Sequence, residues 1–137
     1  PWGEGTPAVF SLPSGIESIG DSNWERSDGI QQLRIDEGFS GSIGDLNWNL
    51  CNQMSKLLIK TTDSNMSIGS GNFTDLNLLA LIQIDCPASC WQGLDNFENS
   101  KSDMIIYVNS IHAAGYDATW SGDQAVPNGA TIISYNP

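Results

Sequence analysis

Alternating apolar and polar residues predict short β-strands along the chain. Residues 31–39 place Leu33 and Ile35 on the opposite side from their polar neighbours, and residues 104–108 form a β-branched run between polar flanks. Shorter runs predict three further strands, at residues 6–12, 65–68 and 131–135. Turn-forming residues separate the runs, so we expect short strands joined by loops.

Other spacings predict helices. Apolar residues from Leu46 to Leu58 recur every three or four positions, which indicates a helix over residues 46–60 with Asp45 as its N-cap. Pro87 suits the first turn of a second helix over residues 88–97. The remaining segments are residues 15–29 and 115–130, which are predicted loops, and residues 76–84, which fit either a helix or a buried strand.

These elements predict one α+β domain over residues 1–137. Its sheet is expected to be antiparallel, with helices packed on one face. We see no internal repeat, linker or low-complexity segment in the sequence. The chain is therefore expected to fold as a single globular unit.

The net charge of the chain disfavours some classes of binding partner. Sixteen acidic and five basic residues give a formal net charge of −11. Nucleic acids and anionic membranes attract clustered Lys and Arg, so neither is an expected partner. No apolar run reaches the roughly 18 residues needed to span a bilayer, so this chain is expected to be a soluble domain without a membrane segment.

Three cysteines leave two interpretations open. Cys51, Cys86 and Cys90 suit one disulfide and a spare thiol in an exported protein, or three reduced core thiols in a cytosolic one. The only histidine, His112, is distant in sequence from the Cys-x₃-Cys pair, so a zinc site is not expected. We expect no other metal and no cofactor.

Acidic residues are the main candidates for catalysis. Asp36 with Glu37, or the series Asp21, Glu25 and Asp28, could supply a general acid and base. In a chain this acidic such pairs arise by chance, and solvated surface charge is the expected role. The stretch from Asp21 to Glu25 also resembles the start of a calcium loop, but the required glycine and final glutamate are missing. The protein is therefore expected not to be an enzyme.

Tryptophans in polar loops are candidate ligand-binding residues. Trp24 and Trp120 lie among polar neighbours, where aromatic side chains are unexpected. They could stack on a sugar, or they could cover the edge of the core. The first role predicts a secreted carbohydrate- or surface-binding module.

Three stretches resemble parts of type IVb pilin subunits. In residues 30–71, Cys51, Met54 and Leu57 match the family's Cys-x₂-(Leu/Met)-x₂-Leu segment between two strands. The stretch CPASCWQGLDNFENSKSDMIIYV (86–108) is similar to the family's C-terminal end. The third stretch is VPNGATIISYNP (126–137) read on into PWGEGTPAVF (1–10), which resembles a Val/Ile-Pro segment and an Asn-Pro-(Phe/Trp)-Gly-Gly turn. The order of these stretches is circularly permuted relative to the family.

The resemblance implies a pilin head domain that lacks the family's N-terminal apolar helix. It implies a Cys51–Cys90 disulfide, with Cys86 as the competing partner. It also implies a non-catalytic subunit of an extracellular, cell-surface type IV pilus, with other pilin subunits as partners in a homopolymer and a host surface or glycan as a further ligand. A permuted chain further predicts that its first and last residues lie close together.

Overall fold

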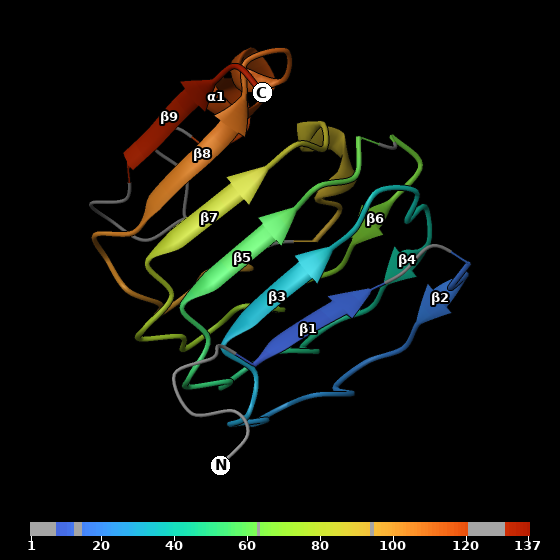
Figure 1. The fold of residues 1–137 in the computed structure, drawn as a ribbon, viewed down its shortest axis with the longest axis vertical. Helices are drawn as coiled ribbons and strands as arrows, with labels where there is room; N and C mark the ends of the chain where they lie inside the picture. The colour runs from blue at the N-terminus through green and yellow to red at the C-terminus, as the bar shows by residue number, and fades with distance from the viewer. Residues whose placement is uncertain (1–7, 13–14, 63, 94, 121–130) are drawn as a thin grey trace.

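The chain winds into a stack of similar coils. The computed structural model describes residues 8–12, 15–62, 64–93, 95–120 and 131–137. Strands recur at a near-constant interval, with Val9 pairing with Gln32 in the first coil and Ile105 with Thr131 in the last. All of these pairings are parallel, so each coil adds one strand to the same sheet, as in a β-solenoid. Figure 1 shows the strands side by side.

The coils build two parallel sheets. The principal sheet runs in the order β1 (Val9–Leu12), β3 (Gln32–Ile35), β5 (Lys56–Ile59), β7 (Leu81–Ile84), β8 (Ile105–Asn109) and β9 (Thr131–Tyr135). A smaller sheet runs β2 (Ser18–Ile19), β4 (Ser42–Ile43) and β6 (Ser67–Ile68). The helical elements are a 3₁₀ turn, η1 (Ala88–Cys90), and a short helix, α1 (Ala113–Trp120).

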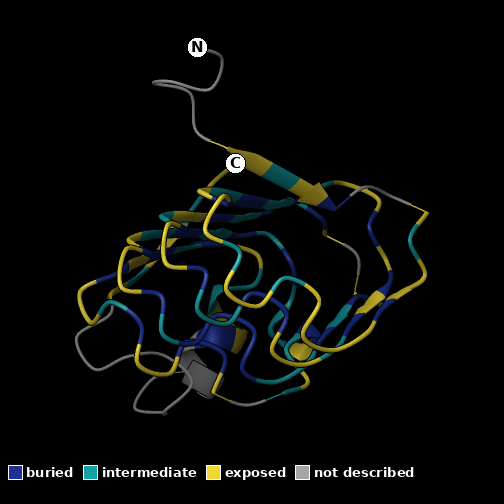
Figure 2. Ribbon diagram, turned by 90° about the horizontal axis from the view of Figure 1, so that it is seen from below, coloured by how far each residue is buried: buried dark blue, intermediate teal, exposed yellow. Residues whose placement is uncertain are grey.

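The core lies between these sheets. Central strands of the principal sheet alternate buried residues with partly or fully exposed ones, as a sheet with one solvated face requires. The buried apolar residues of β3, β5, β7 and β8 are Leu33, Ile35, Leu57, Ile59, Ile82, Ile84, Ile106 and Val108. The smaller sheet supplies the opposite wall through Ile19, Ile43 and Ile68. Figure 2 shows the buried residues inside the coils and the exposed ones along the turns.

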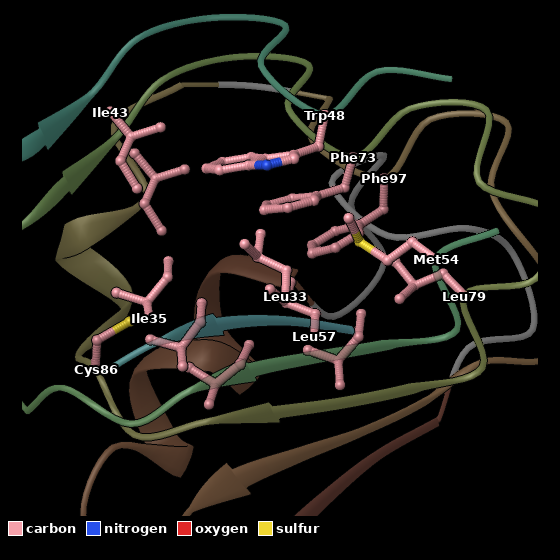
Figure 3. Packing of buried hydrophobic residues seen from close by; sticks show 14 of the residues in the cluster. Leu33, Ile35, Ile43, Trp48, Met54, Leu57, Phe73, Leu79, Cys86 and Phe97 are labelled. Carbon is pink, nitrogen blue, oxygen red and sulfur yellow. The ribbon is translucent and has the colours of Figure 1, made fainter. Parts of the chain in front are cut away.

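An aromatic column fills the third side of the coils. Trp24 stacks on Trp48 with ring centroids 5.2 Å apart, and Trp48 stacks on Phe73 at 5.5 Å. Phe97 continues the column at 5.5 Å from Phe73. Each of the first four coils contributes one ring, and Figure 3 shows three of the rings lying over one another. Stacked pairs of this kind stabilise a core beyond the area that they bury.

An asparagine ladder runs beside the aromatic column. The Asn47 side-chain oxygen accepts the backbone N–H of Asn23 at 3.0 Å, and the Asn72 oxygen accepts that of Asn47 at 3.0 Å. Asn96 accepts the N–H of Asn72 at 2.9 Å. Buried backbone donors need such partners, so the ladder ties each coil to the next where no strand does.

Two corners of each of the first four coils use left-handed backbone. The first corner is formed by Ser22, Leu46, Gly71 and Asp95, with φ of 56°, 59°, 65° and 55°. The second is formed by Arg26, Leu50, Asp75 and Asn99, with φ of 62°, 62°, 60° and 58°. Only one of these residues is glycine, although this conformation costs other residues about 1 kcal/mol or more each. Asp75, Asp95 and Asn99 are of types that tolerate this conformation, but the serine, arginine and leucines at other corners are not, so there the repeated coil imposes its geometry.

The helix predicted over residues 46–60 is wrong. Leu46 and Leu50 adopt positive φ, which no right-handed helix contains. Leu57 and Leu58 are neighbours in β5, where the first is buried and the second faces outward. The spacing of three and four therefore comes from the corners and strand of one coil, and the inter-coil bonds outweigh helix propensity.

Other local predictions have mixed outcomes. Residues 104–108 and 131–135 are confirmed as strands β8 and β9 within one residue, and the strand within 31–39 is confirmed but shorter. The helix over 88–97 is wrong except for η1, because Asp95 is left-handed. The predicted loop at 115–130 begins instead inside α1, and its residues 121–130 lie outside the described part.

The predicted fold class and the pilin resemblance are both wrong. The sheets are parallel, not antiparallel, and almost no helix covers them, whereas a pilin head packs a long helix on its sheet. The chain also repeats, with SIGDSNW at 18–24 recurring as SIGDLNW at 42–48, so the expected absence of repeats is wrong as well. Pro1 lies outside the described residues, and the predicted closeness of the two ends stays a prediction.

Candidate binding surface on the principal sheet

The outer face of the principal sheet presents two rows of side chains. The alternation of side chains along each strand determines which residues belong to these rows, because residues between the buried ones must point away from the core. The register of the parallel pairs aligns one residue from each strand in each row. The first row is Val9, Gln32, Lys56, Leu81, Ile105 and Thr131, and the second is Ser11, Arg34, Leu58, Gln83, Tyr107 and Ile133.

These rows lack acidic residues. Across the described strands, neither row contains Asp or Glu, although the chain carries sixteen of them. Acidic side chains lie instead along the loops, where Asp21, Glu25, Asp45 and Glu98 are exposed. Charge is thus distributed unevenly, and the outer face of the sheet differs from the rest of a strongly acidic protein.

One half of this face is cationic. Arg34, Lys56 and Lys60 lie on or just beyond β3 and β5, and they are three of the five basic residues in the chain. Arg34 forms an ion pair with Asp36 at 3.1 Å. Among the described residues, Lys56 and Lys60 have no ion-pair partner. Two ammonium groups therefore remain available to an anionic ligand.

The other half of the face is apolar. Leu81, Ile105, Tyr107 and Ile133 come from β7, β8 and β9, and all four remain accessible to solvent. Ile105 is 38% exposed and Ile133 is 37% exposed. Contiguous exposed apolar side chains commonly mark a site of protein contact.

A polar cluster borders the apolar half where the strands end. The Tyr135 hydroxyl donates to the Asp85 carboxylate and accepts a hydrogen bond of 3.2 Å from the side-chain amide of Gln83. Desolvation, followed by the bond to Asp85, raises the pKa of Tyr135 to about 12. Asp85 keeps its negative charge in this hydrogen bond, because the Tyr135 hydroxyl is neutral. Asp85 follows β7 as Lys60 follows β5, so one carboxylate as well as the two lysines borders the face.

Trp24, one of the two tryptophans proposed as ligand contacts, is not a free aromatic platform. Trp24 is partly buried, with one ring face on Trp48 and with Phe10 against it at 4.8 Å. It therefore ends the aromatic column, which is the core-edge alternative considered for it. Trp120 is the last residue of α1, and its side chain lies outside the description. The structure does not bring these two residues into one described site.

The three cysteines are all among the described residues; each is buried and none is in a disulfide. Cys51 donates to the backbone oxygen of Trp24 at 3.1 Å, and burial is the main cause that raises the pKa of its thiol. Cys86 contacts the Tyr116 hydroxyl at 3.5 Å and shares a hydrogen bond with Cys90. The Cys51–Cys90 disulfide is not formed in this structure and stays a prediction.

The candidate catalytic carboxylates have structural roles. Asp21 accepts the backbone N–H of Asp45 at 2.7 Å, and Glu25 accepts the side-chain amide of Asn49 at 3.4 Å. Asp36 is held by Arg34. His112 has a buried Nε2 without a hydrogen-bond partner. Within the described part of the chain, no group of three His, Cys, Asp or Glu side chains could hold a metal ion.

Comparison with protein-family models, curated proteins and solved structures gave no match. Among the described residues, no helix is long and apolar enough to cross a membrane. Sequence reasoning missed this surface because neighbours within a row are 23 or more positions apart, and only the repeat interval brings them together. The sequence signal that could have revealed this interval is the recurrence of Ser-Ile-Gly-Asp at 18–21 and 42–45.

Proposed function

We propose that this protein is a non-catalytic binding module that holds an acidic protein segment on the outer face of its principal sheet. The observation that carries the proposal is the absence of Asp and Glu from both outward rows of a chain with net charge −11. A rigid stack of coils suits this role, because solenoids use their extended faces for binding.

The two halves of the face define the partner's chemistry. Lys56 and Lys60 would attract carboxylates, while Ile105 and Ile133 would bury apolar side chains. From β5 to β9 there are three strand spacings, or about 14 Å at roughly 4.8 Å each. An extended chain covers that distance in about four residues. The expected ligand therefore carries acidic residues about four positions from a group of apolar ones.

Other occupants fit the surface less well. Two copies of this chain would each bring a charge of −11 and would repel one another at low salt. A glycan platform built on loop tryptophans has no support from Trp24, which belongs to the aromatic column. The filament-subunit function depended on the pilin resemblance, so we do not carry it forward.

A synthetic peptide tests the proposal. We would label a peptide with a glutamate-rich half and a leucine-rich half and titrate it with the protein by fluorescence anisotropy. Replacing both Lys56 and Lys60 by Glu should weaken binding about tenfold or more, and added salt should weaken the wild-type complex. Lys101→Glu is the matched control, because Lys101 lies off the sheet and pairs with Asp103 at 2.6 Å.

A second matched pair tests the apolar half. Ile105→Asp should weaken binding, whereas Leu78→Asp should not, because Leu78 is 50% exposed but lies in the loop before β7. Circular dichroism would establish that each variant is folded. Equal losses from Lys101→Glu and the lysine pair, or no binding by the wild type at low salt, would contradict the proposal. Self-association by sedimentation would favour a second copy instead.

A further inference from the structure

Two of the three thiols lie together at one corner of the stack. Cys86 lies two residues before η1 and Cys90 is its last residue. Both are fully buried, and their side chains share a hydrogen bond. The turn between them is closed by a bond of 3.0 Å from the Cys90 N–H to the Pro87 oxygen. Cys51 is separated from this pair and bonds to Trp24 in another part of the core.

We propose that Cys86 and Cys90 are a dithiol site that closes to a disulfide in the folded protein. Residues 86 and 90 are four apart across a tight turn, and their buried side chains are in hydrogen-bonding contact, which is the proximity that a bridge requires. This pairing differs from the Cys51–Cys90 bridge that the sequence resemblance implied. It is independent of the binding face, which lies on the outer side of the principal sheet.

The oxidant is a small-molecule disulfide such as oxidised glutathione. The thiolate of one cysteine attacks it, forms a mixed disulfide and releases one glutathione thiol. The second cysteine then loses its proton, attacks the mixed disulfide and releases the other glutathione thiol. The protein gives up two protons and two electrons, and the oxidant becomes two thiols.

Helix α1 covers the site. The Tyr116 hydroxyl donates to the Cys86 backbone oxygen at 2.7 Å and accepts a hydrogen bond of 2.9 Å from the Trp91 indole N–H. The hydrogen bond with Cys90 and burial both raise the pKa of Cys86, so little thiolate is present at neutral pH. An oxidant reaches the pair only when this corner opens, and the test therefore measures equilibrium, not rate.

The experiment compares folded and unfolded chains. The protein would be refolded and equilibrated in glutathione redox buffers with and without urea, and free thiols would be alkylated before trypsin digestion. Cleavage after Arg34, Lys56, Lys60 and Lys101 places Cys51 in peptide 35–56 and the proposed pair together in peptide 61–101. A bridge within the pair thus removes two hydrogens from one peptide, whereas the alternative pairing would join the two peptides.

We expect peptide 61–101 to be oxidised and Cys51 to be alkylated. The ratio of disulfide to dithiol should be about tenfold or more higher in native buffer than in urea, because the fold holds the thiols together. Cys51→Ser should behave like the wild type, and Cys90→Ser should leave Cys86 alkylated. An equal or lower ratio in native buffer would overturn the proposal, as would a link between peptides 35–56 and 61–101.

Discussion

Gly69 lies where two coils approach closely, and replacing it with alanine should destabilise the fold. A methyl group at this position would lie 2.6 Å from the Gly44 oxygen and would also meet the Asp45 carboxylate. Gly69 does not need glycine for its backbone angles, since its φ is not among the positive values. The effect of Gly69→Ala would therefore report the spacing between coils and not backbone strain.

The magnitude follows from the displacement that the methyl group requires. Moving the contact from 2.6 Å to an ordinary 3.4 Å would stretch two inter-coil bonds, from Gly69 N–H to the Ile43 oxygen at 2.8 Å and from Ser70 N–H to the Asp45 carboxylate at 2.7 Å. Each lost bond costs about 1 kcal/mol, and overpacking adds about 1–3 kcal/mol. Reduced entropy of the unfolded chain offsets about 0.4–1 kcal/mol. We expect a net loss of about 2–5 kcal/mol.

Equilibrium unfolding in urea, followed by tryptophan fluorescence and circular dichroism, would measure this loss. Gly29→Ala is the first control, because a methyl group there meets nothing within 4 Å. Gly20→Ala is the second and sharper control. Gly20 holds the same place in the first coil, where the nearest atom is the Asn23 side-chain nitrogen at 3.9 Å. Both controls should change the free energy of unfolding by less than about 1 kcal/mol.

The comparison between equivalent glycines decides the outcome. If Gly69→Ala changed the free energy of unfolding by less than about 0.5 kcal/mol, the coils would not be packed as closely as described. A loss from Gly20→Ala as large as that from Gly69→Ala would also refute the reasoning, because no coil precedes Gly20 in the stack of the smaller sheet. A loss confined to Gly69 would support stacked coils.

Three further predictions concern the interior and the strand ends. Asn72→Ala should lower the free energy of unfolding in urea by about 2–4 kcal/mol, because the buried N–H of Asn47 loses its acceptor. Asn23→Ala, at an exposed position, is the control. A loss from Asn72→Ala no larger than that from Asn23→Ala would argue against the ladder. Trp48→Ala should cost about 3–5 kcal/mol by the same assay, and a loss below about 1 kcal/mol would contradict its place inside the aromatic column. Because the pKa of Tyr135 rises from 10.0 to about 12 on folding, its contribution is complete below pH 10 and is lost as the pH rises toward 12. The free energy of unfolding, measured across this pH range, should fall less steeply with pH in Tyr135→Phe than in the wild type. Equal slopes in the two proteins would exclude the effect.

Strand positions were predictable where local composition decides them. Residues 105–108 and 131–133 are β-branched or aromatic and lie between polar flanks, and they form β8 and β9 as expected. The direction of pairing was not predictable from these runs, because a short apolar strand looks the same in either kind of sheet. Only the repeat interval distinguishes a solenoid from a meander.

The repeat was difficult to see because few of its positions keep the same residue. Ser-Ile-Gly-Asp at 18–21 and 42–45 becomes Ser-Ile-Gly-Ser at 67–70 and Cys-Trp-Gln-Gly at 90–93. What persists is the role of each position, such as the asparagine of the ladder and the ring that follows it. The interval also changes by a residue or two between coils, which weakens any fixed-period comparison.

The candidate surface could not be read from sequence for a related reason. Lys56, Ile105 and Thr131 share one row only because successive coils align them. Within each strand, the sequence predicts which residues face outward but not which strands are neighbours. The prediction that Trp24 binds a ligand came from its polar neighbours along the chain. In the folded protein Trp24 packs instead on Trp48, which is distant in sequence.

Chemical-shift mapping would test the central claim most directly. Two-dimensional ¹H–¹⁵N spectra would be recorded as the acidic–apolar peptide is added to the labelled protein. We predict that the largest shifts fall on β3, β5, β7, β8 and β9, with the cationic strands responding to the glutamate half and the apolar strands to the leucine half. Shifts concentrated on the acidic loops around Asp21 and Asp45, or no shifts at saturating peptide, would contradict binding on the principal sheet.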